Sequence, residues 1–182
     1  NAQCRRLLRR RVALVTLHYC PACGAEGFAP ETAKRWRCGA CAFRYYHNVA
    51  TAVAVVLRVG EAVLLTERAR APQQGFLDFP GGFVDPEETL EAAAERELEE
   101  ELGLAIDSAA LTYRFSLWNR YPYAEVTYPT SDVYFELTLP SRPVLRCADD
   151  VAGAYWFPSP AAIPRARLAF PAVVEAVERL AS

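Results

Sequence analysis

Three glutamates near the middle of the chain, Glu97, Glu100 and Glu101, have the spacing needed to hold a cation together. On a helix, which turns by about 100° per residue, side chains at i, i+3 and i+4 lie on one face. Carboxylate oxygens are the ligands that Mg²⁺ and Mn²⁺ prefer. The spacing therefore predicts a divalent metal site on a helix.

The helix expected to carry these glutamates spans residues 85–103. Asp85 is a good N-cap, Pro86 suits the first helical position, and Glu88 completes a capping box. Gly103 is a natural left-handed terminator.

Small and apolar residues on the glutamate stripe indicate that this face packs against a sheet. Leu90, Ala93 and Ala94 precede the three glutamates on it. Three carboxylates on a partly buried face are too costly unless a cation neutralises them. The alternative is a solvated acidic helix end. The opposite face, however, already carries the acidic residues that solubility needs: Glu91, Glu95 and Glu99.

The segment from residue 82 to residue 104 resembles a named motif. Gly82 is followed after five residues by Glu88, and after seven more by Arg96-Glu97-Leu98-Glu99-Glu100-Glu101-Leu102-Gly103-Leu104, which matches the Nudix box at every defined position. The preceding Phe79-Pro80-Gly81-Gly82 fits the usual approach to that box. On this resemblance the chain is identified as a member of the Nudix hydrolase family.

The resemblance implies a hydrolase of the phosphoanhydride bond in a nucleoside diphosphate linked to another moiety, with Mg²⁺ or Mn²⁺ as the catalytic cofactor. A diphosphate would be repelled by a pocket rich in carboxylates unless bound cations reversed the sign of the charge. The backbone carbonyl of Gly82 is a further metal ligand carried over from the family.

The box residues are expected to divide the catalytic work. Glu100 or Glu101 acts as the base or orients the attacking water jointly with the metals, and Glu97 ranks third. Arg96 lies off the metal stripe, so we expect it to brace a glutamate through a bidentate pair in which Glu88 takes part.

Residues outside the box are candidates for substrate contact. Arg68 would contact the substrate phosphates, with an ordinary surface arginine as the alternative. Asp149 and Asp150 would supply the later carboxylate that the family often adds, and a solvated loop pair is the alternative. Trp118 and Tyr121 fall in a predicted loop, where aromatic rings are expected to stack on a base or nicotinamide ring.

Four cysteines supply a second motif. Cys20 and Cys23 form one CxxC pair, and Cys38 and Cys41 form another after a short loop. Four thiolates at this spacing suit a tetrahedral structural Zn²⁺. Two disulfides or a redox-active CxxC are the alternatives.

The residues that follow the two CxxC pairs differ. Gly24 permits a tight left-handed turn after the first pair, whereas Ala42 takes the matching place after the second. That alanine would cost about 1 kcal/mol if the turn requires a left-handed residue. Cys4 and Cys147 have no evident partner and are expected to be free thiols.

The predicted organisation is a basic N-terminal arm (1–17), a zinc ribbon (18–47) and a Nudix domain (48–182). Apolar and β-branched runs predict strands at 49–57, 62–66, 111–117, 132–139 and 154–157, with short extended pieces at 75–84 and a closing helix at 170–180. Strands alternating with helices predict an α/β class with a mixed sheet and helices on both faces. The family resemblance implies the same α/β/α sandwich.

Composition agrees with a compact enzyme. The chain has 182 residues, 52% of them hydrophobic, and a formal net charge of −2, which gives no general attraction to nucleic acid or to an acidic membrane. No apolar run approaches the roughly 20 residues that span a bilayer. We expect a cytoplasmic enzyme with a small-molecule nucleotide substrate. The arginine cluster at 5–11 is expected to be a solvated arm, with phosphate or RNA contact as the alternative.

A ribbon ahead of a Nudix domain resembles the NADH pyrophosphatase branch, which favours NADH, NAD or ADP-ribose as substrate. The chain lacks that branch's Ser-Gln-Pro-Trp-Pro-Phe-Pro stretch after the box. Hydrolysis of dinucleoside polyphosphates or of nucleotide-capped RNA ends therefore stays open, as does a sensor that binds nucleotides without cleaving them. Related enzymes are often two-fold dimers, so a homodimer is a further expectation.

Overall fold

The structure, a computed structural model, describes residues 17–123 and 126–182. These residues group into two compact units. The second unit comprises Ala50–Tyr121 and Pro129–Ser182, and the first comprises the described residues of 1–49 and of 122–128. The predicted arm, including Cys4, lies outside the described residues apart from Leu17. The predicted boundary at residue 48 stays a prediction.

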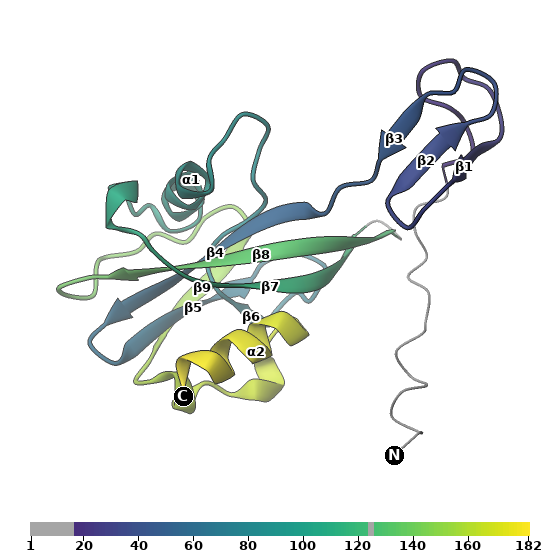
Figure 1. The fold of residues 1–182 in the computed structure, drawn as a ribbon. Helices are drawn as coiled ribbons and strands as arrows, with labels where there is room; N and C mark the ends of the chain where they lie inside the picture. The colour runs from purple at the N-terminus through teal and green to yellow at the C-terminus, as the bar shows by residue number, and fades with distance from the viewer. Residues whose placement is uncertain (1–16, 124–125) are drawn as a thin grey trace. The chain divides into compact units, whose positions relative to one another are not determined.

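The first unit is built on a three-stranded antiparallel sheet, drawn in purple and blue in Figure 1. Its strands are β1 (Phe28–Pro30), β2 (Arg35–Cys38) and β3 (Arg44–Tyr46). The core is small, with the rings of Phe28 and Trp36 stacked at 5.9 Å beside the buried Cys20 and Cys38. A module with so few buried side chains depends on a bound metal ion or on disulfides for its stability.

The second unit contains a six-stranded mixed sheet in the order β6-β5-β4-β8-β7, with β9 also paired to β5. The central pair, β4 and β8, is parallel, and the pairs that β5 makes with β4, β6 and β9 are antiparallel. The strands are β4 (Ala50–Val59), β5 (Ala62–Arg68), β6 (Leu77–Asp78), β7 (Thr112–Tyr123), β8 (Val126–Thr138) and β9 (Val151–Phe157).

Helices cover both faces of this sheet (Figure 1). Alternate residues of β4 point to opposite faces: Val53 and Val55 pack with α1 (Leu90–Leu102), whereas Val56 packs with α2 (Pro171–Leu180). The predicted α/β/α sandwich with a mixed sheet is confirmed.

Three short 3₁₀ helices, Ser108–Ala110, Pro160–Ala162 and Arg165–Arg167, lie in the connections. Within the described ranges, every helix falls short of the length and apolar character that a membrane crossing requires.

The predicted start of the box helix is wrong. Its N-cap is Thr89, whose hydroxyl accepts a hydrogen bond from the Ala92 N–H at 3.2 Å, and not Asp85. Glu87 has a φ of 70°, which no right-handed helix tolerates, so residues 85–88 form a separate turn. The predicted end is confirmed, because Gly103 is left-handed with a φ of 63° and donates its N–H to the Glu99 carbonyl.

The predicted loop around Trp118 is also wrong, because β7 runs on to Tyr123. Its outer end includes Pro122, and β7 is the edge strand of the sheet, which is where a proline is tolerated within a sheet. Pro129 of β8 lies just before the parallel pairing with β4 begins at Thr130. Pro122 thus lies on an edge strand, and Pro129 lies outside the hydrogen-bonded ladder between β4 and β8.

Candidate active site

A cleft of about 330 Å³ opens in the second unit and gathers most of the residues predicted to be functional. One half is acidic and lies on the α1 side of the sheet. The other half is lined by residues of the α2-side core, among them Tyr134, Phe170 and Val173. The predicted residues that line the cleft are Gly82, Arg96, Glu97, Glu100, Glu101, Arg68, Tyr121, Asp149 and Asp150.

Glu101 is the most deeply buried of the three glutamates, with 6% of its surface exposed. Its Oε2 accepts a hydrogen bond from the Gly81 N–H at 2.9 Å. Burial, together with the nearby Glu97 and Asp78 carboxylates, raises the pKa of Glu101 to about 8, and the hydrogen bond from Gly81 offsets part of the rise. The site therefore disfavours this negative charge unless a cation is present.

Glu97 is also buried, at 9% exposure, and burial raises its pKa. It packs directly against the backbone of Gly82, so that a side chain at that position would overlap the carboxylate. The neighbouring Gly81 has a φ of 143° and lies against the Val53 carbonyl. Both glycines are required for this close approach of the turn to α1 and β4.

The carbonyl of Gly82, the expected metal ligand, accepts a hydrogen bond from the Val53 N–H at 2.8 Å. A carbonyl oxygen has two lone pairs, so this bond leaves one available for a second partner.

Arg96 connects the acidic groups on the α1 side. Its Nε and Nη2 donate to the two oxygens of Glu88 at 2.9 and 3.0 Å, which is the bidentate pair expected from the sequence. Its Nη1 donates to Glu97 at 2.8 Å and to Glu100 at 3.1 Å. Nη2 also donates to the Phe83 carbonyl at 3.0 Å, which ties the guanidinium to the turn before α1.

Two expectations about the glutamates need correction. The Glu100 side chain is 51% exposed, so only Glu97 and Glu101 carry buried carboxylates. The three carboxylates also do not converge on one point. Among the described residues, a set of three or more ligand atoms within 4.8 Å of one another occurs only in the cysteine cluster. The reason is that Arg96 draws Glu97 and Glu100 towards itself while the Gly81 amide holds Glu101.

Asp149 and Asp150 line the acidic half of the cleft from the segment before β9. Both are about half exposed and pair with Arg70, at 3.6 and 2.8 Å. Asp149 has a φ of 49°, a conformation that aspartate tolerates better than most residues. Both lie near enough to α1 to act on its glutamates, since Asp149 raises the pKa of Glu97 and Asp150 raises that of Glu101.

Arg68 lines the other half of the cleft and makes three hydrogen bonds within the protein. It donates to the Pro72 carbonyl at 2.8 Å, to Asp78 at 3.4 Å and to the Tyr121 hydroxyl at 3.2 Å. Its guanidinium also lies over the rings of Tyr121 and Phe170, at 5.8 and 5.3 Å. These contacts hold Arg68 in the wall, so it is not the free surface arginine of the alternative reading.

Trp118 does not line the cleft. Side chains of β7 alternate, so Asn119 and Tyr121 point inward while Trp118, at 70% exposure, points outward beside Arg120. Its expected stacking role has no support in this geometry. Tyr121, in contrast, lies on the cleft wall with Phe83 edge-on at 5.3 Å.

The predictions from the sequence missed a group of polar residues in the α2-side half: the buried Asn119, Thr130 and Asp132 and the partly buried Asp78. The signal for one of them was present. Asp132 and Tyr134 alternate with the apolar residues that face α1 along β8, so an aspartate occupies a core-facing register position. Burial raises the pKa of Asp132 and raises that of Asp78 to about 6.

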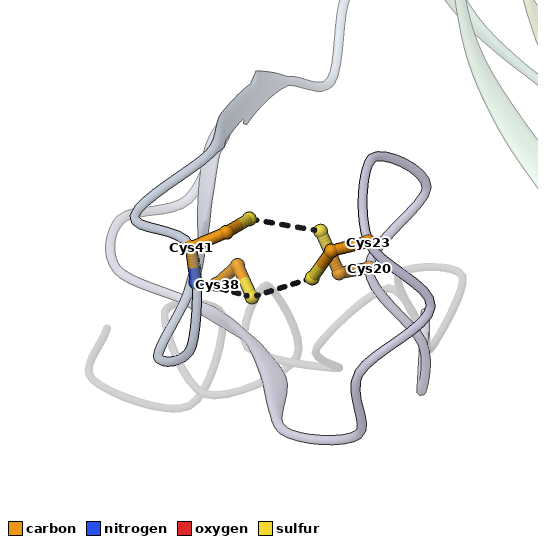
Figure 2. A group of neighbouring side chains, drawn as sticks. All are labelled: Cys20, Cys23, Cys38 and Cys41. Atoms are coloured by element: carbon orange, nitrogen blue, oxygen red, sulfur yellow. Dashed lines mark hydrogen bonds between the residues drawn. The ribbon is translucent and has the colours of Figure 1, made fainter.

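The four cysteines of the first unit gather as predicted (Figure 2). The Sγ atoms of Cys20 and Cys41 are 3.7 Å apart, and those of Cys23 and Cys38 are 3.8 Å apart. A tetrahedron with Zn–S bonds of about 2.3 Å has edges of about 3.8 Å, whereas a disulfide needs about 2.0 Å. The cluster therefore fits a tetrahedral metal ion, and all four thiols are free, as is the exposed Cys147.

Backbone amides support this cluster. The N–H groups of Cys41 and Ala40 donate to the Cys38 sulfur and lower the pKa of that thiol to about 7. Gly24 and Ala42 are both left-handed, with φ values of 71° and 60°. The alanine thus adopts the conformation that its counterpart glycine adopts freely.

Comparison with known proteins supports the same reading. The family model described as NUDIX domain matches residues 47–176. The chain belongs to the NUDIX domain family.

Two curated relatives bear the name NAD-capped RNA hydrolase NudC. The one from Deinococcus radiodurans is 38% identical over 103 residues, which is 54% of this chain and 35% of the relative. The one from Escherichia coli O1:K1 / APEC is 35% identical over 88 residues, 48% of this chain and 34% of the relative. The chain thus spans about a third of the length of these relatives.

Solved NUDIX structures share the fold. A NUDIX hydrolase from Nitrosomonas europaea superposes with a TM-score of 0.64 at 24% identity, covering 90% of this chain and 89% of that one. A bifunctional NMN adenylyltransferase/ADP ribose pyrophosphatase from Francisella tularensis gives a TM-score of 0.60 at 23% identity, with 73% and 41% covered. At these identities the likeness establishes the fold of the NUDIX domain.

Proposed function

We propose that this NUDIX domain hydrolyses the phosphoanhydride bond of a nucleoside diphosphate linked to a second moiety, with NADH, NAD or ADP-ribose as the favoured substrates. The observation that carries the proposal is the pairing of buried Glu97 and Glu101 beside the Gly81–Gly82 turn. Arg96 pairs with Glu97, whereas Glu101 accepts the uncharged Gly81 N–H, so a bound cation would offset the cost of burying the second carboxylate as an anion.

The donor set fits Mg²⁺ or Mn²⁺. Every candidate ligand is a hard oxygen: the carboxylates of Glu97, Glu100 and Glu101 and the remaining lone pair of the Gly82 carbonyl, with Asp149 and Asp150 opposite. When bound, such a cation neutralises phosphate charge and lowers the pKa of a water molecule. The cleft volume of about 330 Å³ is within the range of small-molecule sites.

The chain's own groups divide the remaining work. Glu97 and Glu101, held by Arg96 and the Gly81 amide, supply fixed negative charge for the cation. Glu100, half exposed at the mouth of the cleft, orients the attacking water and accepts its proton. Arg96 keeps Glu97 and Glu100 in place through its anchor on Glu88.

For the first unit, we propose that Cys20, Cys23, Cys38 and Cys41 bind one structural Zn²⁺. The tetrahedral edge lengths support this ion over a disulfide framework. Free thiols are typical of a reducing compartment, which supports action in the cytoplasm. A homodimer stays a prediction.

Cleavage of nucleotide-capped RNA is the second candidate, because both NudC relatives are named as NAD-capped RNA hydrolases. The same diphosphate bond is present in the free dinucleotide and at the RNA end, so the two activities would use one cleft.

A substrate panel tests the proposal: NADH, NAD, ADP-ribose, diadenosine polyphosphates, CoA, nucleoside triphosphates and NAD-capped RNA, each with Mg²⁺ or Mn²⁺. We expect a nucleoside monophosphate from NADH, NAD or ADP-ribose. A kcat/KM for capped RNA well above that for free NAD would favour the second candidate. Binding of these compounds without any cleavage would instead identify a sensor.

A further inference from the structure

The α2-side half of the cleft contains a buried hydrogen-bonded triad that the proposed hydrolysis does not use. Asp132 is 9% exposed, Asn119 is 8% exposed and Thr130 is 2% exposed. The Asn119 amide donates to one oxygen of Asp132 at 2.9 Å, and the Thr130 hydroxyl donates to the other at 2.6 Å. All three residues line the cleft.

The remaining hydrogen-bonding capacity of the triad can be counted. The Asn119 Oδ1 accepts the Arg120 N–H at 2.8 Å, and its Nδ2 donates one of two hydrogens to Asp132, so one N–H is left over. These two bonds also fix the orientation of the amide, because a flipped amide would place its N–H₂ against the Arg120 N–H and its oxygen against the Asp132 carboxylate. Each oxygen of Asp132 has accepted one hydrogen bond and can accept another. The triad therefore presents an acceptor next to a donor.

Aromatic rings and small residues shape the space beside the triad. Tyr121 packs against Phe83 at 5.3 Å and against Phe170 at 5.6 Å, and all three rings line the cleft. In the parallel ladder, Asp132 lies beside Ala52 and Tyr134 lies beside Ala54, so short side chains form the β4 part of the lining. Flat apolar walls at such a position suit a planar ring.

The charge of this half disfavours a phosphate as its occupant. Asp78 lies near enough to Asp132 to raise its own pKa, and Arg68, the one arginine among the described residues that line this half, already donates to Asp78, to Tyr121 and to the Pro72 carbonyl. A ribose diol would satisfy Asp132 but would leave the aromatic walls without a matching surface. A planar ring with an exocyclic N–H₂ next to an acceptor can pack against the aromatic rings, donate to the Asp132 carboxylate and accept from the Asn119 amide.

We propose that Asp132 and Asn119 are specificity-determining residues that recognise a ring edge carrying an N–H₂ donor beside an acceptor. Asp132 accepts from the amine or amide of the ring, and Asn119 donates to the neighbouring acceptor. Adenine has this edge, and so does the carboxamide of nicotinamide. The inference rests on the proposed function, since it assigns the ring attached to the cleaved diphosphate.

Three dinucleotides separate the two sources of this edge. They are NAD, the analogue with hypoxanthine in place of adenine, and the analogue with nicotinic acid in place of nicotinamide. Hypoxanthine places a carbonyl where the amine of adenine was, and nicotinic acid places a carboxylate where the amide was. Either change sets an acceptor against Asp132. We expect the wild-type protein to disfavour one of the two analogues by about 10-fold or more in kcat/KM and in Kd, because the ring edge loses its donor and places an acceptor against Asp132.

The decisive variant is Asp132→Asn, which replaces one acceptor oxygen by a donor. It should reduce the discrimination to about two-fold by improving the disfavoured analogue, with Glu61→Gln in the exposed β4–β5 turn as the charge-matched control. If Asp132→Asn does not fold, Asn119→Ser, which shortens the donor, should likewise weaken discrimination. Equal treatment of all three compounds by the wild-type protein, or an equal loss on all three in the variant, overturns the inference. Absence of cleavage overturns the proposed function instead, and the Kd values then still decide the inference.

Discussion

The Arg96 guanidinium donates hydrogen bonds to both oxygens of Glu88 and also to the carboxylates of Glu97 and Glu100. Glu88 lies in the turn before α1, outside the helix itself. The pair therefore fixes the turn to the helix and sets the positions of two glutamates that face the cleft. Arg96 is a positioning residue, since it acts through the carboxylates that it holds.

We predict that Arg96→Lys lowers kcat by about 10- to 100-fold, because a lysine ammonium cannot form the planar bidentate pair with Glu88. The test is steady-state kinetics together with a thermal melt. Glu88→Gln keeps the shape of the side chain but replaces one of the two acceptor oxygens by a donor, so it should lower kcat by a smaller factor. Wild-type kcat in Arg96→Lys would show that the anchor does not position the glutamates.

The two glycines before the helix should respond differently to alanine. Gly82 has an ordinary φ, and the atoms nearest to its new methyl group would be those of the Glu97 carboxylate, so Gly82→Ala should displace Glu97 and lower kcat by about 100-fold with a small stability loss. Gly81→Ala would place the methyl group against the Val53 backbone at a φ of 143°, so it should destabilise the domain by about 3 kcal/mol or more. Denaturant unfolding and kinetics on both variants check the contrast, and equal unfolding free energies would contradict it.

The raised pKa of Glu101 predicts a pH effect on stability in the presence of a chelator. The folded pKa of about 8 lies above the ordinary value of 4.5, so between these values the folded protein binds more protons than the unfolded chain. The free energy of unfolding then falls as pH rises from about 4.5 to about 8. Glu101→Gln, which removes the titration, should be more stable than wild type at pH 8 by about 2–4 kcal/mol and lose this advantage near pH 5.

Chemical denaturation at the two pH values, each with and without Mg²⁺, measures this effect. The cation should remove most of the difference at pH 8 by stabilising the ionised wild-type carboxylate. A Glu101→Gln variant that is less stable than wild type at pH 8 in chelator would contradict the burial argument. Glu61→Gln, an exposed carboxylate, serves as the control and should be neutral.

The left-handed alanine after the second CxxC pair is a stability defect that can be repaired. Ala42→Gly should stabilise the zinc-bound ribbon by about 1 kcal/mol, because glycine adopts a φ near 60° without steric cost. Gly24→Ala should destabilise it by a similar amount. Competition with a zinc chelator measures both changes, and a weaker hold on zinc in Ala42→Gly would show that the turn conformation is not limiting.

The sequence predicted the elements that follow simple periodicity. The buried face of α1, its glycine terminator, the α/β/α layers and the clustering of four cysteines all rest on local spacing. The start of α1 did not follow from the sequence, because the Asp85 pattern is used in a turn and not in the helix. The Glu88 carboxylate accepts the Asp85 N–H, as in a capping box, and also binds Arg96, while Glu87 takes a left-handed conformation. The contact with Arg96 joins residues eight positions apart, which local patterns do not reveal.

The α2-side half of the cleft was hidden from the sequence for a different reason. Asp132 and Asn119 come from separate strands, and their approach depends on the length and pairing of β7 and β8. The sequence predicted strands at 111–117 and 132–139, but two prolines and several polar residues hid the continuation of β7 to Tyr123 and the earlier start of β8 at Val126. Once the strand is recognised, alternation alone separates the inward Asn119 from the outward Trp118.

The central claim is that carboxylates of this cleft use a divalent cation to cleave a phosphoanhydride. The most direct test is kcat for the best substrate of the panel, measured for Glu100→Gln and Glu61→Gln in Mg²⁺ and in excess chelator. We expect Glu61→Gln to match wild type in Mg²⁺ and to lose activity in chelator, and Glu100→Gln to fall by about 100-fold or more in Mg²⁺ while remaining folded. Equal turnover of the two variants, or cleavage that persists in chelator, would contradict the account.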